Sequence, residues 1–268
     1  MSNINIEDKD TKGGADAPVD KLGQIRALLF VCKEPEMLLE AFQPEYDQNA
    51  IDDVLLRKYQ EMLSSIGYAR DKVLRYPVFF ESFYPDISSG IAFDESFNHH
   101  VHAYLQDMDT LKNKLETYVD HARKDVSAVA TNSDDVSAYY RALKQEIGSS
   151  FEGTSEHRNP HVHHGPRFMD GAALRAENAR KGREIFGSIF PNANPDRVAE
   201  FHREQEEEER NASAEAKAHW IAMAQRNNEK VTGLVDTVVT ASANHLFHLL
   251  GMEEMVVKLK EMNPGITL

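Results

Sequence analysis

Residues 51–73 read IDDVLLRKYQEMLSSIGYARDKV, and this stretch decides the fold class. Its apolar side chains recur at steps of three and four residues: Ile51, Val54, Leu55, Tyr59, Met62, Leu63, Ile66 and Val73. That spacing places them on one face of an α-helix. Asn49 precedes the stretch and can cap it, so the sequence predicts an amphipathic helix here.

Three further segments show the same helical spacing. The longest follows Asp94 and carries one apolar stripe, made of Phe97, Val101, Leu105, Met108, Leu111, Leu115, Tyr118 and Val119. Ser133 can cap a helix that continues to about Ile147, because its hydroxyl accepts a hydrogen bond from unpaired backbone N–H groups. Asp170 can cap another helix, which we expect to stop before Pro191.

The C-terminal third combines a polar helix with an apolar one. Residues 196–229 are very polar and include the acidic run Glu204–Glu209, which is typical of a solvated or partner-facing helix. Residues 231–250 are rich in Val and Leu and predict a final, centrally placed helix. The sequence therefore predicts an all-α protein, a helical bundle of long antiparallel helices with a long His/Gly/Pro-rich loop at residues 148–171.

We expect a single helical domain at residues 23–268, preceded by a disordered tail at residues 1–22 that has too few apolar groups to offset backbone ordering. Two segments inside the domain lack a clear helical pattern. The apolar run at residues 22–42 is interrupted by Pro35, so it is either a kinked helix pair or a strand followed by a helix. The aromatic stretch at residues 76–85 predicts a packed, extended crossover.

Charge and composition narrow the class of protein. The chain has a formal net charge of −14, which opposes broad binding of nucleic acid unless a local basic site meets the phosphates. The single cysteine, Cys32, cannot form an internal disulfide, and no N-terminal signal sequence is evident, so we expect a cytoplasmic protein. No uncharged apolar stretch of about 18 residues occurs, which argues against a membrane-spanning helix.

Residues 156–167, EHRNPHVHHGPR, concentrate the side chains best suited to chemistry. Four histidines, two arginines and one asparagine fall within this segment. A guanidinium group presents a planar fork of donors to phosphate oxygens, and an imidazole accepts or donates a proton near neutral pH. Together these groups are suited to cleaving a phosphodiester bond. Alternatively, Arg158 and His163 have a structural role and form salt bridges that order the loop.

The string RNPHVH at residues 158–163 resembles the Arg-polar-x-x-x-His signature of HEPN-type helical domains, many of which are metal-independent ribonucleases. The resemblance implies that Arg158 and His163 are catalytic and that Asn159 orients them. In the same His- and Arg-rich segment, His161, His164 and Arg167 are candidate substrate contacts.

The same resemblance implies RNA as the substrate, attack by the RNA 2′-hydroxyl, no cofactor and a homodimer in which two protomers pair their motifs. The biological role implied by the resemblance is that of a toxin or defence effector. Such a protein would have an antitoxin or another protein as its partner. The family also contains binding modules without activity, so the fold alone does not imply catalysis.

Two other functions fit the same residues. His99, His102, His161 and His163 could ligate zinc or another transition metal, because imidazole is a common ligand for such ions. Alternatively, a non-catalytic helical interaction module would bind another protein through the polar helix at residues 196–229 and its acidic surface. His245 and His248 lie in the apolar final helix, where we expect them to satisfy buried partners.

Overall fold

The computed structural model describes residues 20–33, 52–153, 171–262 and 265. Within these ranges the chain forms helices and no strand, which confirms the predicted all-α class. The elements are α1 (Lys21–Lys33), α3 (Asp53–Leu74), α4 (Tyr76–Ser82), the short 3-10 helix η3 (Ile87–Ser89), α5 (Phe93–Val129), α6 (Ser133–Ser150), α8 (Gly171–Ile189), α9 (Pro195–Leu249) and α10 (Glu253–Met262). Most of the predicted N-terminal tail lies outside the described residues, although Lys21 and Leu22 already belong to α1.

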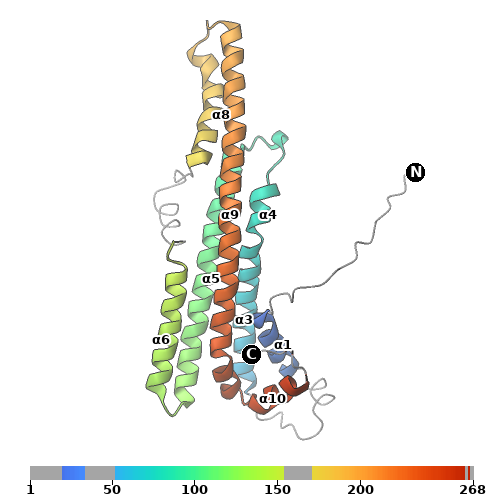
Figure 1. Cartoon of the computed structure of the whole chain (residues 1–268), viewed down its shortest axis with the longest axis vertical. Coiled ribbons are helices and arrows are strands. Elements are labelled where there is room, and N and C mark those ends of the chain that lie inside the picture. The colour runs from blue at the N-terminus through green and yellow to red at the C-terminus, as the bar shows by residue number, and fades with distance from the viewer. Residues whose placement is uncertain (1–19, 34–51, 154–170, 263–264, 266–268) are drawn as a thin grey trace, which may run out of the picture.

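The helices form an elongated bundle around α5, which packs against α3, α6 and α9 (Figure 1). Consecutive long helices run antiparallel, as in the pairs α3 and α5, α5 and α6, and α8 and α9. The longest helix, α9, has 55 residues. At a rise of 1.5 Å per residue it is about 82 Å long. Together with α8 it projects beyond the rest of the bundle as a helical hairpin.

The helix predicted from residues 51–73 is present as α3, and its buried face includes Tyr59, Leu63 and Ile66. Its N-cap is Asp52, whose side chain accepts hydrogen bonds from the backbone N–H groups of the next turn at 2.9 and 3.0 Å. The predicted cap Asn49 lies outside the described residues. The predicted Ser133 cap is wrong, because α6 begins at that residue and Asn132 occupies the cap position.

The prediction of an extended crossover at residues 76–85 is wrong, because Tyr76–Ser82 is helical. Pro77 lies in the first turn of α4, where its missing N–H has no intrahelical partner to lose. The aromatic rings of Tyr76 and Phe80 are buried, with their centroids 5.9 Å apart, so this short helix belongs to the core. The apolar run at residues 22–42 begins with a helix, α1, and its remainder from residue 34 lies outside the described residues.

The polar segment at residues 196–229 and the apolar segment at 231–250 form one continuous helix rather than two. Lys230 and Val231 join them, and neither residue interrupts helical hydrogen bonding. The difference in polarity reflects two different neighbours, because the first half of α9 packs on α8 and the second half enters the bundle. No helix in the described part of the chain is long and apolar enough to cross a membrane.

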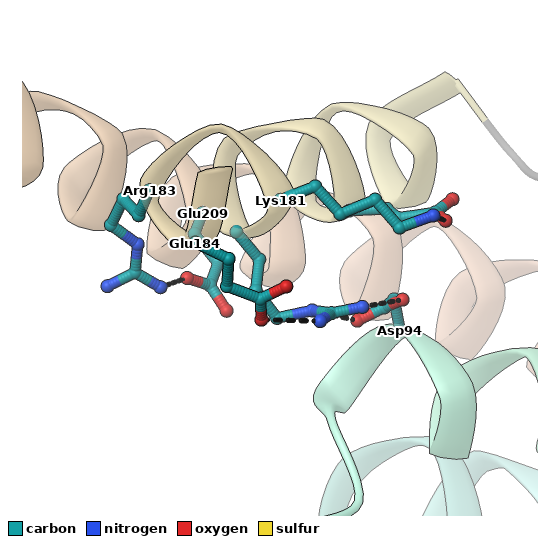
Figure 2. A network of polar contacts seen from close by, with 7 residues as sticks. Asp94, Lys181, Arg183, Glu184 and Glu209 are labelled. Carbon is teal, nitrogen blue, oxygen red and sulfur yellow. Dashed lines mark hydrogen bonds and ion pairs between the residues drawn. The ribbon is translucent and has the colours of Figure 1, made fainter. Parts of the chain in front are cut away.

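Small side chains and ion pairs hold the α8–α9 hairpin together. Buried alanines lie along both helices, at positions 172, 173, 176 and 179 of α8 and 212 and 216 of α9. The acidic run of α9 meets arginines of α8. Arg183 pairs with Glu209 (Figure 2) and with Glu206 at 3.1 Å, and Arg175 pairs with Glu208 at 3.3 Å. Much of this acidic run therefore has a partner inside the chain itself.

Candidate functional site

The residues assigned to catalysis and substrate binding lie outside the described part of the chain. All of them belong to residues 154–170, and they are Arg158, Asn159, His161, His163, His164 and Arg167. The described residues on either side of this segment are Gly153 and Gly171. Their surroundings define what the structure contributes to the candidate site.

The histidines of α5 do not form a metal centre with other described residues. His99 and His102 are exposed, while the Nε2 atom of His100 contacts the backbone carbonyl of Phe83. No group of three or more His, Cys, Asp or Glu side chains is placed to hold a metal ion within the described ranges. The proposed partners in the metal site, His161 and His163, lie outside these ranges.

The histidines of the final helix have different environments. His245 is half-buried, and its Nδ1 atom lies 3.2 Å from the hydroxyl of Tyr140, so it has the kind of partner that the sequence predicts. His248 is exposed and pairs with Glu253 at the start of α10. The prediction of a buried partner for His248 is therefore wrong, because it faces solvent near the end of α9.

A cavity of about 670 Å³ lies between α5, α6 and α9, at the C-terminal end of α6. α6 packs extensively on α5 but touches α9 much less, which leaves space between the two outer helices. Apolar side chains form much of its lining: Leu105, Met108, Phe151, Met223, Val231 and Leu234. The cavity therefore has an apolar interior that opens beside the last turn of α6.

Two polar side chains meet inside this cavity. Asn227 of α9 donates a hydrogen bond from Nδ2 to the hydroxyl oxygen of Tyr104 on α5, at 2.9 Å. Burial raises the pKa of Tyr104, so the phenol keeps its proton at neutral pH. Because the phenol oxygen accepts from Asn227, its own O–H remains available as a donor. The Asn227 carbonyl oxygen is an acceptor beside it.

Charged side chains flank the same cavity on two helices. Lys230 of α9 and Glu146 of α6 both line it and are exposed. Neither side chain forms an ion pair with another described residue. The cavity therefore offers one cation and one anion to an incoming ligand, on walls contributed by different helices.

The cavity and the Arg/His motif are close in the sequence. Phe151 and Gly153 line the cavity, and Arg158 follows Gly153 by five residues. An extended chain advances at most about 3.6 Å per residue, so five residues span at most about 18 Å. The motif is therefore close in sequence to one wall of the cavity.

Sequence reasoning missed the residues of this cavity. Tyr104 lies on α5, whereas Asn227 and Lys230 lie on α9, more than 100 residues later in the chain, and none of the three belongs to a recognisable motif. One local signal was present, because Gly233 stands in the middle of α9, where glycine is a poor helix former. A helical glycine of this kind often marks a close approach or an open site.

The chain matches no family model, no curated protein sequence and no solved structure.

Proposed function

We propose that the protein is a metal-independent RNA endonuclease of the HEPN type, with Arg158 and His163 as its working residues. One observation carries the proposal: the motif begins five residues after Gly153, which lines the α5–α6–α9 cavity next to the end of α6. The all-α architecture of the described residues agrees with a helical ribonuclease domain. Lys230 at the cavity supplies the local positive charge that an acidic chain needs to hold a phosphate.

The proposed reaction is a transfer within the RNA backbone. The 2′-hydroxyl oxygen attacks the neighbouring phosphorus, and the bond from phosphorus to the 5′-oxygen of the next nucleotide breaks. The 2′-hydroxyl loses a proton and the leaving 5′-oxygen gains one, so protons balance overall. His163 moves a proton at this phosphodiester, and Arg158 stabilises the charge that develops on the phosphoryl oxygens. Asn159 orients the pair, and His161, His164 and Arg167 contact the substrate.

Incubating the purified protein with RNA in excess chelator tests the proposal directly. We expect cleavage by the wild type and its loss in Arg158→Ala and in His163→Ala. Arg226→Ala is the matched arginine control, because this residue is exposed on α9 and lies outside the motif and the cavity lining. Cleavage that persists in both motif variants would remove Arg158 and His163 from the proposal.

The double variant His99→Ala/His102→Ala separates this reaction from the metal-binding alternative. Both residues are exposed on α5, so their substitution is expected to leave the fold intact. The ribonuclease proposal predicts unchanged cleavage in chelator. Activity that the chelator abolishes and that depends on His99 and His102 would favour the metal site. Sedimentation velocity at the assay concentration tests the homodimer.

A second function, a protein-interaction module, is favoured by the end of the α8–α9 hairpin. Ile185, Ile189 and Phe190 are each more than half exposed there, although large apolar side chains are usually buried. The hairpin projects beyond the bundle and so presents these side chains to a partner (Figure 1). Ile185→Ser/Ile189→Ser should then weaken self-association, or binding of a co-purifying protein, without affecting RNA cleavage. Unchanged association would exclude the hairpin end as the interface.

A further inference from the structure

The α5–α6–α9 cavity has the size and lining of a small-molecule site. Its volume of about 670 Å³ lies within the range of roughly 300–1,000 Å³ typical of ligand pockets. Leu105, Met108 and Leu234 give it an apolar interior suited to a flat ring. Apolar walls with a few convergent polar groups are the usual arrangement in such sites.

The polar groups inside the cavity place a hydrogen-bond donor beside an acceptor, as the pairing edge of a nucleobase does. Tyr104 has a phenol O–H to donate, and the neighbouring Asn227 has a side-chain oxygen to accept, with the two side chains joined by a hydrogen bond of 2.9 Å. A nucleobase edge carries a donor and an acceptor side by side, and proteins read unpaired bases through such contacts. The pair Tyr104 and Asn227 can therefore meet the edge of a base that lies against the apolar wall.

Charge at the cavity indicates where a phosphate would lie. Lys230 is exposed, lines the cavity and forms no ion pair with another described residue, so it contributes a positive charge to this wall. Because the whole chain has a net charge of −14, a phosphate would otherwise be repelled. Glu146 on the opposite helix can accept hydrogen bonds from sugar hydroxyls or from an exocyclic amino group.

Gly233 lines the cavity at an exposed position of α9. It lies in the interior of α9 and lines the cavity, yet a Cβ atom built on it would meet no atom within 4 Å. The glycine is therefore not required by close packing, and its backbone φ is not in the left-handed region. A larger side chain at this position would fit the helix and would occupy space in the cavity.

We propose that the α5–α6–α9 cavity binds a nucleotide, with its base between the apolar side chains and the Tyr104–Asn227 pair and its phosphate at Lys230. The ligand is either a free nucleotide or one nucleotide unit of an RNA strand, since both present the same base, sugar and phosphate. This inference deepens the proposed function, on which the choice of a nucleotide rests. The cavity would select the nucleotide that stands beside the cleaved bond.

Isothermal titration calorimetry of the full chain tests the cavity without requiring cleavage. The ligands are the four ribonucleoside monophosphates, the matching nucleosides, and a short 2′-O-methyl RNA that has no attacking hydroxyl. Gly233→Leu adds a bulky side chain to the lining of the cavity and keeps a good helix former at that position. Gly187→Leu is the matched control, because Gly187 is also an exposed helical glycine with open space around its Cβ position and lies on α8, away from the cavity.

We expect the wild type and Gly187→Leu to bind at least one nucleotide equally well, and Gly233→Leu to weaken that binding at least about tenfold, as loss of buried contacts of this kind does. Lys230→Gln should remove most of the preference for a nucleotide over its nucleoside, since only the nucleotide has a phosphate. Circular dichroism and thermal unfolding verify that each variant is folded. Competition between a mononucleotide and the 2′-O-methyl RNA shows that the strand uses the same site, and mononucleotide binding without competition assigns the site to free nucleotide.

Two results would overturn the inference. One is no binding of any nucleotide or of the RNA by the wild type, and the other is binding that Gly233→Leu leaves unchanged. The proposed function fails in a different way, because it depends on cleavage being lost in Arg158→Ala and His163→Ala. If Gly233→Leu weakens binding while the motif variants cleave RNA like the wild type, the nucleotide site in the cavity stands. The assignment of Arg158 and His163 as catalytic residues is then wrong.

Discussion

Arg180 of α8 donates from Nε and Nη2 to the two carboxylate oxygens of Asp94 on α5, at 2.9 and 3.0 Å. Asp94 is only 5% exposed and lies in the first turn of α5, where a negative charge is also favoured by the helix dipole. The hydrogen bonds to Asp94 raise the pKa of the Arg180 guanidinium further above its ordinary value. This two-bond contact fixes the middle of α8 to the first turn of α5 (Figure 2).

Removing the carboxylate should therefore loosen the hairpin. Asp94→Ala leaves Arg180 partly buried with only Glu184 as a partner, and breaking a buried pair of this kind costs about 3 kcal/mol of unfolding free energy. Urea denaturation measures the loss, and hydrogen exchange should show reduced protection in α8. Arg197→Ala is the control, since its pair with Glu200 is exposed and contributes at most about 0.5 kcal/mol. Equal effects of the two substitutions would contradict the anchoring role of Asp94.

A buried hydroxyl pair links α5 to α9 in the core. The hydroxyls of Tyr118 and Ser242 are 2.6 Å apart, and the Ser242 hydroxyl also lies 3.0 Å from the carbonyl oxygen of Val238. Burial raises the pKa of Tyr118 to about 12, so the phenol is protonated and can donate. Ser242→Ala should cost about 2 kcal/mol of unfolding free energy, because it leaves the Tyr118 O–H without an acceptor.

The double variant of this pair provides the sharper measurement. Adding Tyr118→Phe to Ser242→Ala removes the unpaired hydroxyl, so the double variant should be no less stable than Ser242→Ala alone. Chemical denaturation of the wild type and the three variants completes the cycle. Additive losses would show that the two hydroxyls do not depend on each other.

Asp20, which directly precedes α1, should make the free energy of unfolding depend on pH. Its carboxylate accepts a hydrogen bond from Nη1 of Arg70 at 2.8 Å, and this bond lowers its pKa below the ordinary value of 3.8. A lowered folded-state pKa means that the unfolded chain binds protons more readily, so the stabilisation is present above about pH 4 and is lost as the pH falls through the folded-state pKa.

Asp20→Asn should therefore lose about 0.5–1 kcal/mol of unfolding free energy at neutral pH, a modest value because the carboxylate is half-exposed. Thermal unfolding from pH 7 to pH 3 should show this difference shrinking toward the acid end. In an Arg70→Gln background the pH-dependent part of the difference should be smaller, and only the contributions of the Gly23 N–H and Arg26 should remain. A difference that grows as the pH falls would have the wrong sign for this pair.

Helical periodicity predicted the long helices well because their buried faces repeat at a fixed step. Tyr59 and Leu63 of α3, like Leu111 and Leu115 of α5, are fully buried as their spacing requires. The stretch beginning at Tyr76 was harder, because proline and aromatic residues suit an extended segment as well as the start of a short helix. Only its tertiary contacts with α5 and α9 decide between the two.

The predicted boundary between two helices near residue 230 was wrong for a different reason. The change there from polar to apolar side chains suggests two helices, but polarity reports the neighbours of a helix and not its ends. Neither Lys230 nor Val231 is a residue that ends helices, so the backbone continues. The cavity around Tyr104 and Asn227 depends on the spacing between α5, α6 and α9. The residue pattern of a single helix does not predict that spacing.

The chemistry of Arg158 yields a graded prediction for the proposed reaction. If Arg158 stabilises charge on the phosphoryl oxygens, Arg158→Ala should lower kcat by about 10²–10³, as loss of a charge-stabilising donor does in other enzymes. Arg158→Lys keeps the positive charge but replaces the planar fork with a single ammonium group, so it should recover only part of the loss. Single-turnover cleavage in chelator measures the chemical step apart from RNA binding. A lysine variant as active as the wild type would mean that Arg158 contributes charge alone, and an alanine variant that weakens only RNA binding would place Arg158 outside the reacting phosphodiester.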